Sequence, residues 1–441
     1  IIRMSGKNCF DVLQKIFIPI HKKSIEEIKG YTMQYGHIVD DNQCIIDEVL
    51  VSYFKAPKSY TTENMCEINT HGGNVVEKEI LELCLKNGAD LAEPGEFTKR
   101  AFLNGRIDLL QAESVIDIIN AKSKREAEEG IKQLQGVLSE KIAAIKQEIM
   151  NVMVNIEVVI DYPEYDVEDI TISQIKAMLD SVGNKLIQLE KSFDNGKLIK
   201  DGIKTAIIGK PNVGKSSLLN AILNEDRAIV TEFEGTTRDT IEEFVNINGI
   251  PLKLIDTAGI RKAKDQVERI GIEKSKEMAT DADLIIAIFD STKELSDEDL
   301  AILDLAKNKK TIIILNKIDQ KPQVLSENDL RFTDVTNNII KISALNKWGI
   351  DELYDKITNL FQLNEINLDN EVMITNVRQK NLINKAIENV QKAKEAINNN
   401  APTDIIAIFI KEILEDLGSI TGEVVSEDII NEIFSKFCLG K

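Results

Sequence analysis

The sequence has little of what builds metal centres or disulfide frameworks. Its 441 residues include five cysteines and three histidines, and no two cysteines form a C-x-x-C pair. Zinc sites and small disulfide-stapled folds both depend on clusters of these residues. The composition therefore excludes both classes, and we expect a cytoplasmic protein whose thiols stay reduced.

Long hydrophobic runs are also absent. No stretch reaches the length of about 18 apolar residues that a membrane-spanning helix needs, so we expect no membrane partner. No secretory leader is visible. The sequence begins Ile1-Ile2-Arg3 without a methionine, and we expect a few residues to precede it.

Basic residues are outnumbered. The net charge is −19, from 54 Lys and Arg against 73 Asp and Glu. This balance argues against nucleic-acid binding by bulk electrostatics, because that mode needs many cationic contacts to phosphates. Local contacts to nucleic acid, or binding through a basic partner, stay open.

The hydrophobic content, 43% of residues with 5% aromatic, favours aliphatic cores, and the length predicts about three domains. The patterns of apolar residues divide the chain into four segments. Residues 1–118 are predicted to be mixed α/β, with strands at 49–54 and 65–69 and a helix at 75–85. Residues 119–201 are predicted to be helical, with helices from 142 to Asp161 and at 172–193, and residues 202–362 to form the nucleotide-binding domain. Residues 363–441 are again predicted to be helical, at 377–398, 405–417 and 426–437. We favour one helical domain with the nucleotide-binding domain inserted over two separate helical pieces, because neither half alone has enough apolar surface for a bundle.

The segment Gly209–Ser216 reads Gly-Lys-Pro-Asn-Val-Gly-Lys-Ser, which fits the phosphate-binding pattern G-x-x-x-x-G-K-S. A predicted strand at 205–208 precedes it and a predicted helix at 217–223 follows it. Backbone N–H groups at such a helix N-terminus hold phosphate. Lys215 is expected to reach the β- and γ-phosphates, and Ser216 to ligate Mg²⁺.

The segment Asn316-Lys317-Ile318-Asp319 distinguishes GTP from ATP. It follows a predicted strand at 311–314, and the Asp319 carboxylate can accept hydrogen bonds from two donors that guanine has and adenine lacks. Asn212–Ser217, Asn316, Lys317 and Asp319 are therefore predicted to bind GTP, and two further strand ends add to this set. They are Asp256, Thr257, Ala258 and Gly259, expected near Mg²⁺ and the γ-phosphate, and Ser343, Ala344 and Leu345, expected over the base.

The residue after Gly259 is Ile260. A Ras-type enzyme has a glutamine at this position, and its side chain orients the attacking water. Isoleucine can neither donate nor accept a hydrogen bond. The chain therefore needs another group to position water, or hydrolyses GTP very slowly.

The block Pro94–Gly105 and the ending Cys438-Leu439-Gly440-Lys441, together with the guanine-nucleotide segments, resemble the tRNA-modification GTPase MnmE (TrmE) family over essentially the whole chain. The resemblance implies an N-terminal α+β domain that binds folate and dimerises, and a helical domain with an inserted Ras-like P-loop GTPase domain. It also implies a homodimer that works with an FAD-dependent partner, MnmG (GidA), in a heterotetramer. Together they add a (carboxymethyl)aminomethyl group to carbon 5 of the wobble uridine of tRNA, with 5-formyl- or 5,10-methylene-tetrahydrofolate as one-carbon donor.

The resemblance also implies roles for individual residues. Folate contacts fall on Arg3, Glu67, Arg106 and the terminal Lys441, and Cys438 has a possible role in tRNA modification. Asn212, Thr231, Phe233 and Thr236 match potassium ligands, and Thr237 matches the Mg²⁺-binding threonine. Thr231, Thr236 and Thr237 are also expected to bind GTP. Glu268 matches a water-positioning glutamate, which would answer the absence of glutamine at Ile260. Lys215 and Glu268 are the expected catalytic residues, and Val213, Gly214 and Ser217 belong to the GTP-binding loop.

Two other functions, and a purely structural role for Cys438, stay open at this point. An Era- or Der-type ribosome-assembly GTPase would share the nucleotide segments, but the helical segment after 362 is not basic and lacks a G-x-x-G loop. A pure signalling switch would not need the first 118 residues. Cys438 can be a nucleophile or a thiol that only packs, whereas we expect Cys66 and Cys84 to serve packing.

Overall fold

The computed structural model describes residues 1–21, 27–161, 168–223, 243–247, 249–255, 278–307, 309–361, 373–438 and 440. These residues form two compact units, which are described separately: unit 1 consists of 1–116, 133–179 and 389–441, and unit 2 of 117–132 and 180–388. Among the described residues, no helix combines the length and the apolar character that crossing a membrane requires.

Unit 1 begins with an antiparallel sheet whose strand order is β1-β5-β4-β3-β2. Its strands are β1 Ile2–Ser5, β2 Phe17–Pro19, β3 Thr32–Val39, β4 Ile45–Phe54 and β5 Met65–Asn69. The helices α1 (Cys9–Ile16) and α2 (Asn74–Lys86) contribute to the buried cluster on one face of this sheet. In β4 the side chains of Val49, Val51 and Tyr53 are buried while Leu50 between them is exposed, so the second face carries no helix from this cluster.

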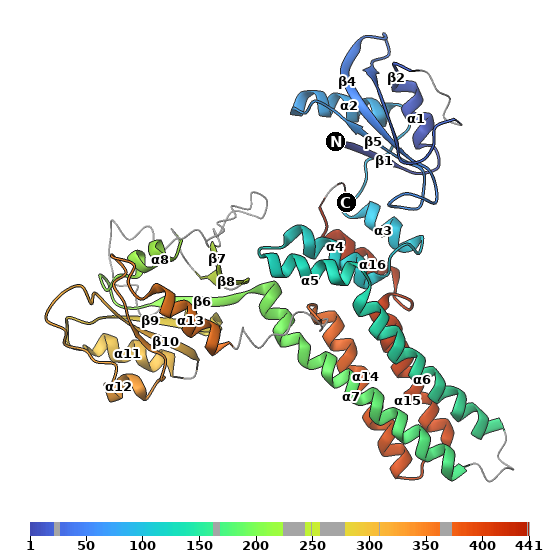
Figure 1. Ribbon diagram of the computed structural model, residues 1–441. Coiled ribbons are helices and arrows are strands. Elements are labelled where there is room, and N and C mark those ends of the chain that lie inside the picture. Colours follow the sequence, from blue (N-terminus) through green and yellow to red (C-terminus); the bar gives the residue numbers. More distant parts are fainter. Residues whose placement is uncertain are drawn as a thin grey trace. The chain divides into compact units, whose positions relative to one another are not determined.

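A further group of helices lies before and after the predicted nucleotide-binding region in sequence. They are α3 Glu96–Leu103, α4 Leu109–Asn120, α5 Lys124–Leu134, α6 Val137–Asp161 and α7 Glu168–Asp201 before it, and α14 Val377–Asn398, α15 Thr403–Thr421 and α16 Glu427–Ser435 after it. In unit 1, α6 lies along α15 (Figure 1), and Lys146 of α6 forms an ion pair with Glu423, which follows the end of α15. The helices from the two sides of the inserted domain therefore share one core, as predicted.

Unit 2 contains a six-stranded sheet of order β11-β10-β9-β6-β8-β7, parallel except for the β7–β8 pair. Its strands are β6 Ile203–Ile208, β7 Glu243–Ile247, β8 Ile250–Leu254, β9 Leu284–Asp290, β10 Lys310–Asn316 and β11 Ile339–Lys341. Among the described residues, the helices that alternate with these strands along the chain are α8 Lys215–Leu223, α11 Asp297–Ala306, α12 Leu330–Thr333 and α13 Ile350–Leu360.

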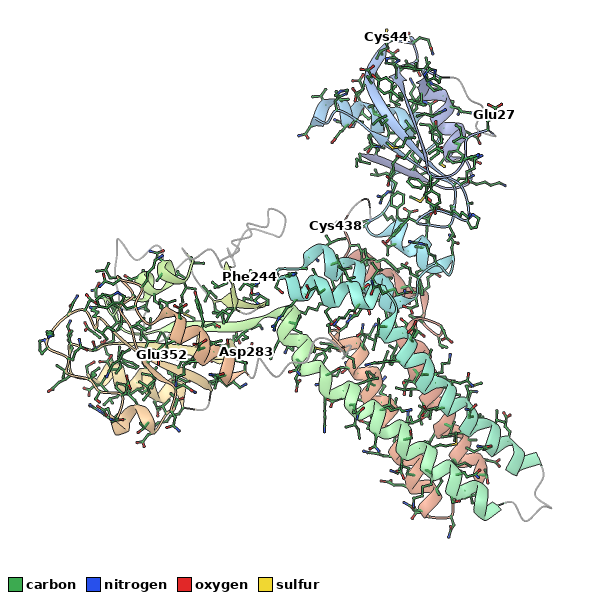
Figure 2. The ribbon with its side chains drawn as sticks, viewed as in Figure 1. Glu27, Cys44, Phe244, Asp283, Glu352 and Cys438 are labelled. Carbon is green, nitrogen blue, oxygen red and sulfur yellow. The ribbon has the colours of Figure 1, made fainter. Side chains whose placement is uncertain are left out.

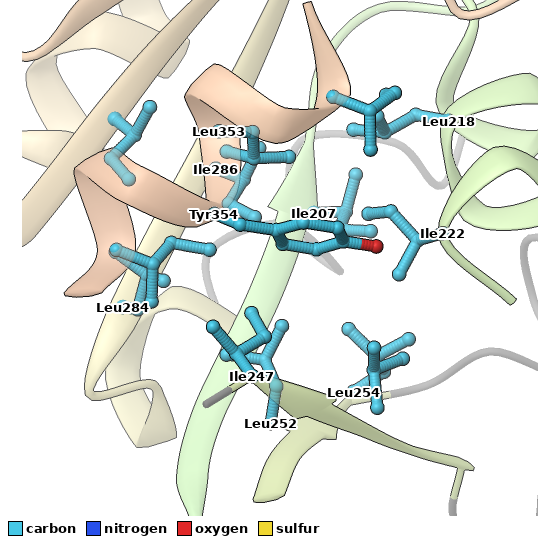
Figure 3. Close-up of a cluster of buried hydrophobic side chains, with 14 of the residues drawn as sticks. Ile207, Leu218, Ile222, Ile247, Leu252, Leu254, Leu284, Ile286, Leu353 and Tyr354 are labelled. Carbon is cyan, nitrogen blue, oxygen red and sulfur yellow. The ribbon is translucent and has the colours of Figure 1, made fainter. Parts of the chain in front are cut away.

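Helices cover both faces of this sheet. Figure 3 shows Leu218 and Ile222 of α8 and Leu353 and Tyr354 of α13 packed over strand residues such as Ile207. The opposite cluster joins Ile302 and Leu303 of α11 and Phe332 of α12 to the alternate strand residues. Because strands buried on both faces must be apolar throughout, β9 reads Leu-Ile-Ile-Ala-Ile-Phe up to its terminal Asp290.

The predicted elements are confirmed with shifted ends. The strands at 49–54, 65–69, 205–208 and 311–314 and the helices at 75–85 and 377–398 all form. Helix α6 ends at Asp161, as expected from the sequence that follows, although residues 162–167 lie outside the described part of the chain. Helix α7 is longer than the predicted 172–193, since its apolar period continues through Ile199 into the sheet domain.

Candidate nucleotide-binding and folate sites

The phosphate-binding loop connects β6 to α8, as its sequence predicts. Asn212 and Gly214 take positive φ values of 62° and 109°, which turn the backbone sharply before the helix begins. The Nζ of Lys215 donates to the carbonyl oxygens of Gly209 and Lys210, both at 2.7 Å. Ser216 and Ser217 are exposed in the first turn of α8, where an anion and its metal would be bound.

Asn316 connects three of the predicted segments. Its side chain is buried, with Nδ2 donating to the Val213 carbonyl at 2.7 Å and Oδ1 accepting from the Ala344 backbone N–H at 3.0 Å. A Cβ on Gly214 would lie 2.1 Å from the same Nδ2, so no larger residue fits there. The structure thus brings the phosphate loop, the Asn316–Asp319 segment and the Ser343–Leu345 loop into one site.

The guanine-recognition segment starts where β10 ends. Lys317 has a positive φ of 70°, and its Nζ lies 2.8 Å from Oδ2 of Asp290 at the end of β9. The Ile318 N–H donates to the carbonyl of Ile342, which fixes the segment against the strand end before Ser343. Asp319 and Leu345 are both exposed.

Asp290 is a site residue that the sequence analysis missed. Burial by itself would raise the pKa of its carboxyl, but the hydrogen bonds from Lys317 and Thr292 outweigh burial and hold the pKa below its ordinary value. Asp290 therefore stays charged and anchors Lys317. The available signal was its place as the polar end of an apolar strand, directly before Ser291-Thr292.

Several predicted residues lie outside the described part of the chain. In the nucleotide site these are Thr231, Phe233, Thr236, Thr237, Asp256, Thr257, Ala258, Gly259, Ile260 and Glu268, and at the C-terminus Lys441. Their assigned roles stay predictions.

Two of the predicted folate residues meet in unit 1. Arg3 of β1 pairs in register with Glu67 of β5, and Arg3 Nε lies 2.7 Å from Glu67 Oε1. Arg3 also donates from Nη1 to the carbonyl of Gly440 at 3.0 Å. The C-terminal tail, distant in sequence, therefore reaches β1 at the residue before Lys441.

Arg106 lies in a neighbouring contact group. Its guanidinium stacks 4.8 Å from the centroid of the Tyr60 ring and donates to the Tyr60 carbonyl at 3.1 Å. The adjacent Thr61 hydroxyl is 2.6 Å from that of Ser5, which is two residues along β1 from Arg3. Arg106 thus connects to the same strand through the Tyr60–Thr61 segment but has no direct bond to Arg3 or Glu67 among those recorded for the described residues.

A cavity of about 840 Å³ opens beside β1 in unit 1. Arg3 and Gly440 line it, as do Glu96, Phe97 and Arg100 of α3. Glu67, Arg106 and Cys438 are not among its lining residues. Arg100 pairs with Glu96 at 2.6 Å and with Glu63 at 3.1 Å, and sequence reasoning noted its block Pro94–Gly105 without assigning this arginine a role.

The cysteines separate into two groups. Cys438 is exposed near the end of the chain (Figure 2), and its carbonyl accepts from the Gly95 N–H at 3.4 Å, while Phe437 beside it is buried. Cys66 and Cys84 are buried in the core of the N-terminal sheet, and burial raises the pKa of Cys84 to about 11. The expectation that these two thiols serve packing is confirmed.

Comparisons with known proteins match nearly the whole chain. Residues 1–106 match the family described as GTP-binding protein TrmE N-terminus, and residues 109–438 match the MnmE helical domain. The chain is 48% identical over 444 residues to the tRNA modification GTPase MnmE of Acetivibrio thermocellus and 49% identical over 441 residues to that of Clostridioides difficile, covering 100% of this chain and 96% of each relative. Among solved structures, the G domain of the T. maritima FeoB iron transporter is 26% identical and covers 36% of this chain and 98% of its own, with a TM-score of 0.26. The chain belongs to the MnmE family of tRNA modification GTPases.

Proposed function

We propose that this chain hydrolyses GTP as part of the enzymatic modification of tRNA. The observation that carries the proposal is the buried Asn316 amide, which joins the phosphate loop at Val213 to the base-side loop at Ala344. An arrangement of this kind holds the phosphates and the base of one nucleotide at a fixed separation. Family membership supplies the connection to tRNA.

The residues of the phosphate loop fit a magnesium–nucleotide complex. A Cβ on Gly214 would lie 2.1 Å from Asn316 Nδ2, so this position suits glycine, and the backbone N–H groups of such loops bind phosphate. Lys215 would exchange its bonds to the Gly209 and Lys210 carbonyls for phosphate oxygens, and the exposed Ser216 would ligate Mg²⁺ together with Thr237. Bound Mg²⁺ would neutralise charge on the phosphates.

Potassium dependence is the second part of the proposal. Asn212 is exposed at a positive-φ turn of the phosphate loop, beside the position that the nucleotide would take. With Thr231, Phe233 and Thr236 as further ligands, a monovalent cation there would offset developing charge on the phosphates, a task that an arginine performs in other GTPases. Glu268 would position the attacking water in place of the glutamine that Ile260 replaces.

Hydrolysis rates in matched potassium and sodium chloride test this part. We expect potassium to accelerate turnover, sodium to have no such effect, and Asn212→Ala to abolish the difference. A matched control is Asn220→Ala, on an exposed position of α8 beyond the loop. Equal rates of the parent chain in both salts would sink the potassium assignment while leaving GTP hydrolysis itself intact.

A folate site at a homodimer interface is the third part. In antiparallel register, Arg3, Glu67 and Leu50 fall on the face of the N-terminal sheet away from α1 and α2, together with Tyr35 and Ile18. Tyr35, Leu50 and Ile18 are large and exposed, and a second copy of this chain covering them would enclose the Arg3–Glu67 pair. A tetrahydrofolate has a ring with hydrogen-bond donors and a glutamate tail, which suit a carboxylate and cations respectively.

Within this proposal, Arg106 and Lys441 hold the folate tail and Cys438 takes part in the chemistry on uridine. The FAD-dependent partner MnmG and the resulting heterotetramer complete the modification of wobble uridine. The domain limits 1–118, 119–201, 202–362 and 363–441 stand as proposals with it.

Equilibrium binding of 5-formyl-tetrahydrofolate to the full chain tests the folate site. We expect Arg3→Ala and Arg106→Ala to weaken binding strongly and to leave GTP hydrolysis unchanged, because both residues lie in unit 1. Arg331→Ala, an exposed arginine of unit 2 paired with Asp329, is the matched control and should bind folate normally. A parent chain that binds no folate, with equal hydrolysis in both salts, would favour a GTPase of the ribosome-assembly class.

A further inference from the structure

We propose that Asp299 is a positioning residue for GTP hydrolysis, which holds the phosphate-binding loop in place through Lys210. The proposal rests on the GTPase function above and adds a residue outside every nucleotide-binding segment of the sequence. Asp299 lies in the first turn of α11, whereas Lys210 is the second residue of the loop. The two are distant in sequence and meet only in the folded domain.

The contact is short and shielded from water. Lys210 Nζ lies 2.5 Å from Asp299 Oδ2, and the two side chains are 24% and 5% exposed. Nζ also donates to Ser296 Oγ at 2.8 Å. Removing one partner of such a pair is costly, because it leaves the other charge with little water to solvate it.

Asp299 is itself held rigidly. Its Oδ2 accepts from the Ser296 backbone N–H at 2.9 Å and from Ser296 Oγ at 3.0 Å, forming the capping box of α11. The helix is anchored beneath it by the buried side chains of Ile302 and Leu303. Oδ1 has no hydrogen-bond partner among the described residues, so all three recorded donors converge on one oxygen.

Packing alone does not fix the loop on this side. A cavity of about 210 Å³ lies against residues 210–213, and Asp290 and Asp299 line its other walls. Pro211 and Asn212 are exposed. Without the ion pair the loop has room to shift toward the cavity, and the Lys210–Asp299 bond opposes that shift at the start of the loop, whereas the Asn316 bond holds it further along, at Val213.

A shift of this loop would disturb two functional groups together. The Lys210 carbonyl accepts a hydrogen bond from Lys215 Nζ, and Asn212, the proposed potassium ligand, is two residues away. Displacements of about 1 Å at a catalytic group can lower turnover roughly 100-fold. The Lys210–Asp299 ion pair, here called the clamp, therefore affects turnover through the positions of Lys215 and Asn212, with no contact between Asp299 and the nucleotide.

The test uses the full chain and a double-mutant cycle of Asp299→Asn, Lys210→Met and both together. Glu298→Gln is the matched control, since Glu298 is the adjacent acidic residue, exposed, in the same helical turn. Lys210→Arg tests rescue, because it keeps the charge. The measurements are kcat and KM for GTP, the affinity for a fluorescent GDP analogue, the potassium concentration for half-maximal activation and the unfolding midpoint.

Each single variant is expected to lower kcat roughly 10- to 100-fold and to raise the potassium requirement, while the double variant is no worse than either, because all three lack the same bond. Lys210→Arg restores most of the rate, and Glu298→Gln behaves as the parent. Variants within about twofold of the parent in kcat, or losses that multiply in the double variant, overturn the proposal. A parent chain without GTPase activity defeats the proposed function instead, and the GDP affinities then decide on the clamp: a loss in both single variants supports it, and unchanged affinity overturns it.

Discussion

The buried Asn316 amide offers the sharpest test of the nucleotide site. Replacing it with alanine removes the donor to the Val213 carbonyl and the acceptor for the Ala344 N–H in a single step. Because these two backbone groups belong to loops on opposite sides of the predicted nucleotide, the change separates the phosphate side of the site from the base side. The fold itself should persist, since β10 and its neighbours are held by other contacts.

The size of the effect follows from the two bonds. A buried hydrogen bond between neutral groups contributes about 1 kcal/mol net, and leaving its partner unsatisfied costs about 1–3 kcal/mol. Water can reach part of the vacated space, so we take the lower end for both groups and expect a loss of about 2–4 kcal/mol. Both bonds belong to the fold, so the free energy of unfolding falls by this amount. Nucleotide affinity falls by at most roughly 30- to 700-fold, at about 1.4 kcal/mol per factor of ten, because binding must then restore the loop positions that the bonds held.

The assay is titration of a fluorescent GDP analogue into parent and variant chains, with the unfolding midpoint measured in parallel. Asn316→Asp separates the two bonds, because it keeps an acceptor for Ala344 and places a carboxylate oxygen against the Val213 carbonyl. It should bind nucleotide at least as weakly as Asn316→Ala. Asn338→Ala, which changes the asparagine directly before β11, is the control. An Asn316→Ala chain with parental affinity would refute the view that this amide organises the site.

Three further predictions concern separate residues. Asp319→Asn should weaken guanine recognition and admit xanthine, which competition by xanthosine triphosphate measures; an unchanged preference for guanine would contradict the base-reading role. Glu126 is buried, and burial raises its pKa from 4.5 to about 7; the charged form is therefore disfavoured in the folded chain, and stability falls on the order of 3 kcal/mol as pH rises from about 4.5 to about 7. Glu126→Gln should accordingly raise the unfolding midpoint at pH 8 and much less at pH 5.5, and an equal gain at both would contradict the assignment. Cys438→Ser should abolish wobble-uridine modification, because the proposed role needs the thiol, and should leave the unfolding midpoint unchanged, because the side chain is exposed. Retained modification would contradict that role. Deleting 437–441 is the poorer test, because it also removes the buried Phe437.

The fold could be predicted from the sequence wherever local pattern decides it. Helix α6 can be predicted from apolar residues that recur every three or four positions, and β10 from its β-branched run, which ends at Asn316. Pairing order is another matter. Nothing local indicates that β1 is the edge strand beside β5, or that Arg3 is opposite Glu67. The register is set by contacts between segments about 60 residues apart in sequence.

The candidate site divides in the same way. The phosphate loop and the Asn316–Asp319 segment were readable because each is a local motif at a strand end. Asp290 and Asp299 were not, because each acts through a lysine that is far along the chain, Lys317 and Lys210 respectively. An acidic residue at a strand end or in the first turn of a helix is common for local reasons, such as capping, and carries no signal of a long-range partner.

The two supports of the phosphate loop differ in their response to salt, which decides how the potassium experiment must be read. The Asn316 bonds are neutral and buried, so ionic strength leaves them unchanged. The Lys210–Asp299 pair is charged but mostly shielded from solvent, so salt screens it weakly. Exchanging potassium for sodium at constant ionic strength alters neither support. A rate difference between the two salts must then arise where the cations themselves are distinguished, and its loss in Asn212→Ala, with Asp299 and Asn316 intact, would locate that discrimination at the turn of the loop.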